Sequence, residues 1–324
     1  MLLLSPLRRG LSALTRARLN LSRRRMRFAG QVVLSEASGN DAIGDAICRG
    51  RPFMAGRLGF HELDAVVSAR AIRVQREGSS LARWRSQIRA EPSQWSSELL
   101  RSLDHIAGFY PAEPATVQRL NDVLTDSVSQ ADLLAVWFRR YEDELMRELA
   151  PSALPILPRG LEPHYHEKPW TLALEGMKVL VVHPYADSIR AQFSRLDAVF
   201  AGKQVWPQCE LVTLKAVQSI AGQRPAFADW FDALEFMQGE INKVNYDVAI
   251  IGAGAYGLPL AAHVKRQGRM AIHVGGATQL MFGIRGKRWD DRPEVCALYN
   301  DSWVRPAAHE TPSAHKGVEN GAYW

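Results

Sequence analysis

The sequence predicts an α/β protein with a Rossmann-like, largely parallel sheet, helices on both faces and a helix-rich N-terminal part. After residue 176, short apolar runs alternate with segments whose apolar residues recur at helical spacing. A glycine-rich turn joins one such run to the helix that follows it. Repeated strand-helix units form a parallel sheet, and its ligand crevice lies beyond the carboxyl ends of the strands.

The N-terminal part, residues 29–150, is expected to hold two short strands and two helical stretches. The strands are "QVVLSE" (31–36) and "RPFMAGRLG" (51–59). The second strand leads into a helix at "FHELDAVVSARAIRV" (60–74), whose apolar spacing is helical. Residues 114–149 are expected to be mostly helical for the same reason.

Residues 151–172 are expected to form a proline-rich connection to the C-terminal part. Five prolines occur within the 20 residues 151–170, and the segment has no apolar period. This pattern indicates either a linker or a connection wrapped around the body.

The C-terminal part, residues 173–324, is expected to be a Rossmann-like nucleotide-binding unit of alternating strands and helices. The expected strands are 179–182, 209–214, 247–251 and 270–274; the expected helices are 187–200, capped by Asp187 or Ser188, 227–242 and the segment after the glycine turn.

The composition is typical of a soluble globular protein, with 47% hydrophobic and 23% charged residues. The net charge of +6 comes from residues 1–27, which hold eight arginines and no acid; 32 basic and 34 acidic residues follow them. Because the body is nearly neutral, we expect no nucleic-acid partner. The three cysteines lie far apart without metal-ligand spacing, which indicates reduced cytosolic residues.

Residues 1–28 form a basic tail, which we expect to be a disordered extension. Its arginines, its serines and its lack of acids are also typical of an organellar presequence or of a weak membrane-surface segment. No run of 18 apolar residues occurs, so no transmembrane helix is expected. We therefore expect a cytoplasmic protein, with peripheral contact at the inner face of the membrane as an alternative for the tail.

The glycine turn "GAGAYG" spells G-x-G-x-x-G with Gly252, Gly254 and Gly257. Such turns bring backbone N–H groups and a helix N-terminus close to a phosphate. An NAD site also needs an acid about 20 residues further on, but the strand 270–274 is followed by "GGATQ". We therefore expect no NAD and favour another phosphate ligand, such as a nucleotide sugar. The alternative is that the glycines only permit tight packing of strand and helix.

Two further strand ends carry polar or glycine-rich turns. His183 follows one strand, and Gly275, Gly276 and Gln279 follow another. Because the carboxyl ends of parallel strands meet at one edge, we expect these residues to converge with the glycine turn. A helix N-terminus beside His183 favours an anion, so His183 is a candidate phosphate contact. A hydrogen-bonded structural role is the alternative.

A basic loop follows, in which Arg285, Lys287 and Arg288 are separated by glycine and precede Trp289. Cations beside an aromatic ring suit a diphosphate and a stacked base or sugar. The alternative is a solvated basic loop.

In the N-terminal part, Arg57, His61, Glu62 and Asp64 cluster where a strand meets a helix. Glu62 lies on the first helical turn, where its carboxylate could bind a metal or an acceptor hydroxyl. An acid in a first turn is also favoured by the helix dipole alone.

These motifs together resemble a bacterial family that is similar to the GT-D fold glycosyltransferases and is often found with cell-surface polysaccharide genes. The resemblance rests on "GRLGFHEL", "KVLVVHPYADSIRAQF", the segment from "DVAIIGAGAYG" to "GIRGKRW", and "WVRPAAHETPSAHKGVENGAYW". It implies a Rossmann-like domain that transfers a sugar from a nucleotide sugar to a glycan or lipid-linked acceptor, often with Mn²⁺ or Mg²⁺.

The motif of that family runs approximately R-x-G-D-G-E. Arg57, Gly59 and Glu62 match it, whereas Phe60 stands where the Asp is expected and His61 replaces the Gly. Three readings stay open: Asp64 compensates, the metal is absent, or this branch binds without catalysing.

The leading prediction is a nucleotide-sugar-dependent glycosyltransferase. In this hypothesis the turn 252–257 and the loop 285–288 hold the diphosphate. Glu62, with Asp64, positions a metal or accepts the acceptor's proton, and Arg57 orients the carboxylate. The alternatives are a non-catalytic Rossmann-type nucleotide-binding protein and an NAD(P)-dependent oxidoreductase.

Overall fold

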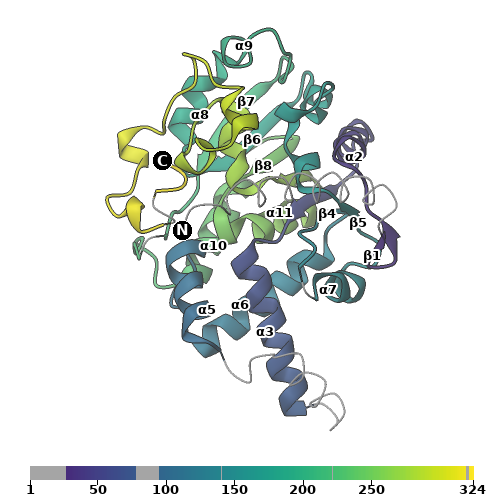
Figure 1. Ribbon diagram of the computed structural model, residues 1–324, viewed down its shortest axis with the longest axis vertical. Coiled ribbons are helices and arrows are strands. Elements are labelled where there is room, and N and C mark those ends of the chain that lie inside the picture. The colour runs from purple at the N-terminus through teal and green to yellow at the C-terminus, as the bar shows by residue number, and fades with distance from the viewer. Residues whose placement is uncertain (1–26, 78–94, 140, 221, 319–320) are drawn as a thin grey trace, which may run out of the picture.

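The computed structural model describes residues 27–77, 95–139, 141–220, 222–318 and 321–324. In this part of the chain, seven strands form one sheet in the order β5-β4-β3-β9-β8-β6-β7, and every pair is parallel (Figure 1). The α/β fold predicted from the sequence is therefore confirmed. The strands are β3 (Phe53–Arg57), β4 (Leu133–Ala135), β5 (Leu154–Ile156), β6 (Lys178–His183), β7 (Glu210–Lys215), β8 (Val248–Ile251) and β9 (Met270–His273).

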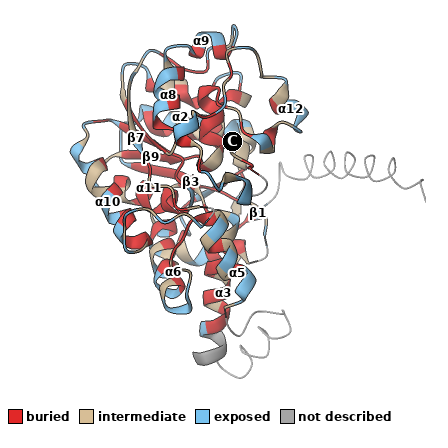
Figure 2. Cartoon of the chain, turned by 90° about the vertical axis from the view of Figure 1, so that its left-hand side faces the viewer, coloured by how far each residue is buried: buried red, intermediate tan, exposed pale blue. Residues whose placement is uncertain are grey.

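The helices cover both faces of this sheet because the central strands are apolar on both sides. In β6, Val179 and Val181 pack into one buried cluster, whereas Leu180 and Val182 pack into the other. Figure 2 shows the buried strands between the two helical layers. The helices are α2 (Glu36–Cys48), α3 (Phe60–Glu77), α5 (Ser97–Ser102), α6 (Pro114–Ser129), α7 (Glu142–Leu149), α8 (Ala186–Phe193), α9 (Leu196–Val199), α10 (Trp230–Lys243), α11 (Gly257–Arg266) and α12 (Pro293–Cys296).

Each layer contains its own group of helices. Side chains of α3, α6, α10 and α11 share one cluster, and side chains of α2, α8 and α9 share the other. Figure 1 shows α3, α5 and α6 extending below the sheet, and the C-terminal segment beside α8. Helix-capping residues set several of these helix starts; at α10, for example, Asp229 Oδ1 accepts hydrogen bonds from the amides of Phe231 and Asp232 at 2.8 and 2.9 Å.

The helical stretch predicted at 114–149 is wrong at its centre. α6 ends at Ser129, Leu133–Ala135 form β4, and α7 begins only at Glu142. β4 lies between β3 and β5 and is buried on both faces. A strand of this kind is continuously apolar, and its sequence pattern cannot be told from that of a buried helix.

The helix predicted at 187–200 is also corrected, because α8 and α9 share that segment. Neither Asp187 nor Ser188 is the cap, since α8 begins at Ala186. The carboxylate of Glu310 accepts from the Asp187 amide at 2.8 Å and from the Ser188 amide at 3.2 Å. The cap thus comes from a residue 123 positions away, which no local pattern reveals.

The proline-rich segment contributes to the sheet as well as connecting two parts of the chain. β5 pairs with β4 and forms one edge of the sheet, with Pro155 inside it. Proline is tolerated at a sheet edge because its missing N–H removes no bond to a second neighbour. The strand expected at 31–36 is shorter: Gln31–Val32 form β2, which pairs with β1 (Arg27–Phe28), and Leu34 makes a single parallel bridge to Ile156 of β5.

The N-terminal and C-terminal parts meet in the middle of the sheet. β3 pairs with β9, and Phe53 lies opposite Met270. The segments 29–150 and 173–324 therefore contribute strands to one sheet.

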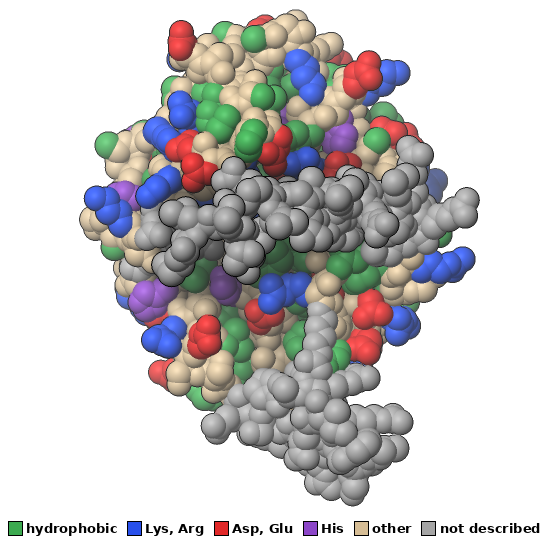
Figure 3. Space-filling model, in the orientation of Figure 1, with side chains coloured by type: hydrophobic (Ala, Val, Ile, Leu, Met, Phe, Trp, Pro, Cys, Tyr) green, Lys and Arg blue, Asp and Glu red, His purple; other side chains and the backbone are tan. Residues whose placement is uncertain are grey.

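The basic tail predicted at 1–28 lies outside the described residues apart from Arg27 and Phe28. The expectation is wrong for these two residues, because they form β1 and Phe28 is buried. On the visible face in Figure 3, acidic and basic side chains are interspersed wherever grey atoms do not cover them. Among the helices of the described residues, none has both the length and the apolarity needed to span a bilayer.

Candidate functional site

A cleft of about 430 Å³ opens at the carboxyl ends of β3 and β9. The crossover helix α8 between β6 and β7 packs on one face of the sheet, whereas α10 and α11, which lead to β8 and β9, pack on the other, so the winding reverses between β6 and β8. Open α/β sheets bind their ligands beyond the carboxyl ends of their strands, and the cleft opens at that edge, next to the reversal point. Arg57 ends β3, His273 ends β9, and both side chains line the cleft.

The lining of the cleft is cationic and aromatic. Among the described residues that line it, four arginines outnumber the two carboxylates, Glu62 and Glu162. The arginines are Arg57, Arg159, Arg288 and Arg292, and the aromatic side chains are Phe60, Trp137, Tyr165, Trp289 and Tyr323. Guanidinium groups bind phosphate oxygens in bidentate fashion, and aromatic side chains supply surfaces for a ring. This lining suits an anionic ligand that carries a ring.

Arg57 is the most enclosed cation of the cleft. Its guanidinium lies 5.2 Å from the ring centroid of Trp137. Within the described ranges, no carboxylate oxygen comes within 4.0 Å of it. Burial lowers the pKa of Arg57, whereas Glu162 and Glu62 act in the opposite direction. Arg57 therefore holds a positive charge that is only partly offset by nearby acids.

Gly275 makes room for this guanidinium. A Cβ at Gly275 would lie 2.5 Å from Nη2 and 2.7 Å from Nε of Arg57, and the backbone φ there is +72°. Both observations require glycine. Gly275, which the sequence predicts as a phosphate contact, therefore also leaves the space that the Arg57 guanidinium occupies.

Glu62 is buried, with 8% of its surface exposed. Burial raises the pKa of Glu62, and its own backbone amide, His61 and Arg57 lower it in part. The carboxylate lies against Gly59, where a Cβ would overlap it. A buried carboxyl with a raised pKa inside a cleft is a candidate for proton transfer.

Asp64 does not join Glu62. Its two carboxylate oxygens accept from Nη2 of Arg139 at 3.1 and 3.2 Å, and it is absent from the cleft lining. Glu62 belongs to no group of three metal-ligand side chains among the residues that the structure describes. Among the described residues, Glu62 is therefore not part of a ready-made cluster of three protein ligands, and Glu162 is the other carboxylate that lines the cleft.

One group of three such side chains lies elsewhere in the described chain, at Asp187, His309 and Glu310. Glu310 caps α8 there, and His309 Nε2 lies 3.0 Å from Asp187 Oδ2. These hydrogen bonds account for the arrangement without an ion.

The three glycines of the G-x-G-x-x-G turn have different neighbours. A Cβ at Gly252 would lie 2.6 Å from His183 Cδ2 and from Thr278 Oγ1, and one at Gly257 would overlap the ring of His273. Gly254, in contrast, is exposed, has φ +53° and would place a Cβ 3.5 Å from the nearest atom. Close packing explains the first and third glycines, and only the second faces the cleft.

Gly254 also borders a smaller cavity of about 90 Å³ at the ends of β6 and β8. His183, Gly252 and Gln279 line this cavity, and it shares Gly276 and Tyr323 with the main cleft. The predicted strand-end residues are thus shared between the main cleft and the smaller cavity beside it.

The two strand-end histidines are neutral near pH 7. Burial lowers the pKa of His183 and of His273 to about 3. His183 Nδ1 accepts from the Tyr185 amide at 3.0 Å, so its proton is on Nε2. His273 Nδ1 lies 3.1 Å from the carbonyl of Ile251 and donates to it. Neither ring supplies a cation for phosphate.

The cations of the basic loop 285–288 lie in different places in the structure. Arg288 lines the cleft, and its Nη1 donates to the Tyr323 hydroxyl at 2.8 Å. Arg285 instead lies 3.6 Å from Asp290 and stacks on Tyr299 at 4.4 Å. Neither Arg285 nor Lys287 is part of the lining of either cavity.

Sequence reasoning missed several residues of the cleft. Glu162, Arg159 and Tyr165 come from the proline-rich segment, and Arg292 and Tyr323 come from the C-terminal region. Burial raises the pKa of Glu162, while Arg57, Arg159 and Arg292 lower it. The feature of the sequence that could have identified these residues was the presence of charged and aromatic residues in segments without secondary-structure periodicity.

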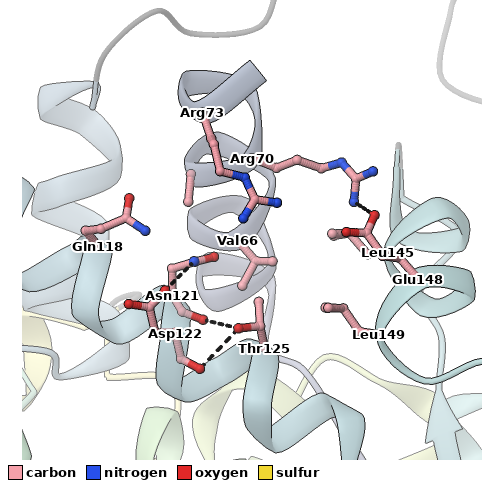
Figure 4. A pocket seen from close by; sticks show the side chains of 11 residues that line it. Val66, Arg70, Arg73, Gln118, Asn121, Asp122, Thr125, Leu145, Glu148 and Leu149 are labelled. Carbon is pink, nitrogen blue, oxygen red and sulfur yellow. Dashed lines mark hydrogen bonds and ion pairs between the residues drawn. The ribbon is translucent and has the colours of Figure 1, made fainter. Parts of the chain in front are cut away.

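A separate cavity of about 170 Å³ lies among α3, α6 and α7 (Figure 4). Arg70 and Glu148 form an ion pair across it, and Thr125 Oγ1 donates to the Asn121 carbonyl at 2.9 Å. None of the described residues that line it is aromatic, and it lies away from the strand ends. We therefore place the candidate site at the arginine-rich cleft.

Comparison with protein-family models, with curated proteins and with solved structures finds no match for this chain. The geometry of the cleft therefore carries the functional conclusion.

Proposed function

We propose that this protein is a glycosyltransferase that takes a sugar from a nucleotide-sugar donor and transfers it to a glycan or lipid-linked acceptor in surface polysaccharide or glycoconjugate synthesis. The observation that carries the proposal is the set of four arginines and five aromatic side chains around the buried Glu62. The resemblance to GT-D glycosyltransferases that we infer from the sequence motifs points to the same activity.

In the proposed reaction, the arginines bind the diphosphate of the donor. The bond between the sugar C1 and the diphosphate oxygen breaks, and a bond from C1 to the acceptor oxygen forms. The acceptor hydroxyl loses its proton to Glu62, whose raised pKa suits it to this transfer. The nucleoside diphosphate leaves with its negative charge held by Arg57, Arg288 and Arg292. Cationic side chains supply the charge stabilisation in this scheme.

The alternative is a nucleotide-binding protein without transfer chemistry. Phe60 stands where the family motif has an acid, and Asp64 is engaged by Arg139. Both observations favour binding over catalysis. Turnover of the donor separates the two functions.

The test is calorimetric titration with UDP, GDP, uridine, guanosine and NAD, each with manganese and with a chelator. We expect a nucleoside diphosphate to bind at least about tenfold more tightly than its nucleoside, because charge-assisted hydrogen bonds to the diphosphate contribute about 1.5–3 kcal/mol each. Arg57→Gln should remove most of that difference. Arg70→Gln, in the cavity of Figure 4, is the matched control and should change nothing.

Donor hydrolysis or transfer is then measured with the corresponding nucleotide sugars. Binding of NAD in preference to every nucleoside diphosphate would contradict the proposal, as would equal affinity for nucleosides and diphosphates. Diphosphate binding without turnover of any donor would favour the binding protein.

A further inference from the structure

The mouth of the cleft carries an exposed aromatic side chain. Phe60 lies at the first position of α3 and keeps 43% of its surface exposed. Large apolar side chains with that much exposure are few among the described residues: Val32, Leu154 and Phe236 are the others. Of these four, only Phe60 lines the cleft.

Phe60 and Trp137 form an aromatic pair. Their ring centroids lie 4.5 Å apart at an interplanar angle of 51°. Trp137 is half-buried and also lines the cleft. We name this pair the aromatic platform.

The platform is held in place from several sides. The indole Nε1 of Trp137 donates to the carbonyl of Leu58 at 2.8 Å. The guanidinium of Arg139 lies 5.0 Å from the Phe60 centroid and is itself bound to Asp64. A rigid aromatic side chain loses little conformational entropy when a ligand packs against it.

The polar groups of the cleft lie close to the platform. Glu62 is two residues after Phe60 on α3, and Arg57, whose guanidinium faces the Trp137 ring, ends the preceding strand. A ligand on the platform is therefore within reach of a buried carboxyl and a cation. Exposed apolar surface that is rimmed by polar groups is typical of a ligand groove.

A pyranose ring matches this combination. One face of such a ring presents C–H groups polarised by neighbouring oxygens, and these pack on the negative face of an aromatic ring. Its hydroxyl groups hydrogen-bond to carboxylates and guanidinium groups. A nucleoside diphosphate would instead occupy the arginines of the cleft.

We propose that Phe60 and Trp137 bind the acceptor as a pyranose ring, so that Phe60 is an acceptor-binding residue. This inference rests on the proposed function, since it names the chemistry of the acceptor for the same site. In this proposal Phe60, which departs from the expected family motif, contributes to sugar binding.

The test uses methyl β-glucoside, methyl β-galactoside and methyl N-acetyl-β-glucosaminide, with sorbitol as an open-chain polyol. Saturation-transfer NMR and titration are run on the full chain, alone and with UDP or GDP. At least one pyranoside should bind the wild type more tightly than sorbitol does. Phe60→Ala should weaken that binding about fivefold or more, and Phe60→Trp should restore it to within about threefold, the scale of a stacking contact.

Phe236→Ala is the matched control, because Phe236 is 46% exposed and also pairs with another ring, that of Phe227 at 5.0 Å. It should leave pyranoside binding unchanged. Phe60→Ala should leave UDP and GDP affinity within about twofold of the wild type, because the diphosphate lies on the arginines.

Three results would overturn the inference: no pyranoside binds the wild type, sorbitol binds as well as the pyranosides, or Phe60→Ala binds them as the wild type does. A change in melting temperature alone, with pyranoside affinity kept, would assign Phe60 to packing only. Absence of UDP and GDP binding counts against the proposed function and is read in a separate titration, so the two failures are distinguishable.

Discussion

Replacing Gly257 by alanine sets two physical effects against each other. Gly257 lies at the start of α11 with helical φ −62° and ψ −47°. By helix propensity alone, Gly→Ala at such a position stabilises a protein by about 0.5–1 kcal/mol. Packing predicts the opposite, because the new Cβ would lie closer than 3.0 Å to three ring atoms of His273.

The ring of His273 has little freedom to move. It is 4% exposed, and its Nδ1 is hydrogen-bonded to Ile251 at 3.1 Å. Overpacking a rigid site costs about 1–3 kcal/mol. After the gain in propensity is subtracted, we expect Gly257→Ala to lower the free energy of unfolding by up to about 2.5 kcal/mol.

Urea unfolding followed by circular dichroism measures this difference. Gly239→Ala is the control, since Gly239 lies inside α10 and a Cβ there would meet nothing within 4 Å. It should stabilise by about 0.5–1 kcal/mol. In a His273→Ala background, Gly257→Ala should lose its cost, which gives a coupling energy of about 1–3 kcal/mol. If Gly257→Ala stabilises the chain as Gly239→Ala does, close packing is not the reason for the third glycine of the turn.

Three further predictions concern the site. Burial raises the pKa of Glu62 above its ordinary 4.5, so the contribution of Glu62 to stability is full below pH 4.5 and is lost as the pH rises through the folded pKa. Glu62→Gln should therefore melt at the same or a higher temperature than the wild type in calorimetry at pH 7.5. A lower melting temperature would contradict this prediction. Burial lowers the pKa of His183 from 6.5 to about 3, so stability present above pH 6.5 is lost as the pH falls toward 3; His183→Gln should flatten the pH dependence of urea unfolding by up to about 1.4 kcal/mol per pH unit, and equal slopes would refute the assignment. Gly254→Ala, at φ +53° with open space around it, should cost about 1–2 kcal/mol of stability and weaken nucleoside diphosphate binding in calorimetry; undiminished affinity would exclude this turn from the ligand site.

Local patterns in the sequence predicted much of the sheet. The segments 179–182, 247–251 and 270–274 are short β-branched apolar runs next to polar or glycine-rich turns, and all three are strands. β4 and β5 were not predicted. β4 sits in a longer apolar segment, and β5 contains a proline, so its pairing depends on a place at the edge of the sheet.

The site was predictable only where one short motif holds its members. Arg57 and Glu62 lie five positions apart and both line the cleft. Glu162 and Tyr323 reach the cleft through the strand order, which no local pattern encodes. Asp64 was a candidate because of its spacing, but Arg139, 75 residues away, binds it outside the cleft.

The pairing of β3 with β9 also has a consequence for synthesis of the chain. Phe53 cannot pair with Met270, its neighbour in the finished sheet, until the ribosome has synthesised the chain as far as β9. At about 5–20 residues per second, the ribosome takes about 10–40 s to deliver the missing strand. During that interval one side of β3 presents backbone N–H and C=O groups that another nascent chain can pair with. Slower translation between residues 53 and 270 should therefore increase co-translational aggregation while leaving the melting temperature of the finished protein unchanged.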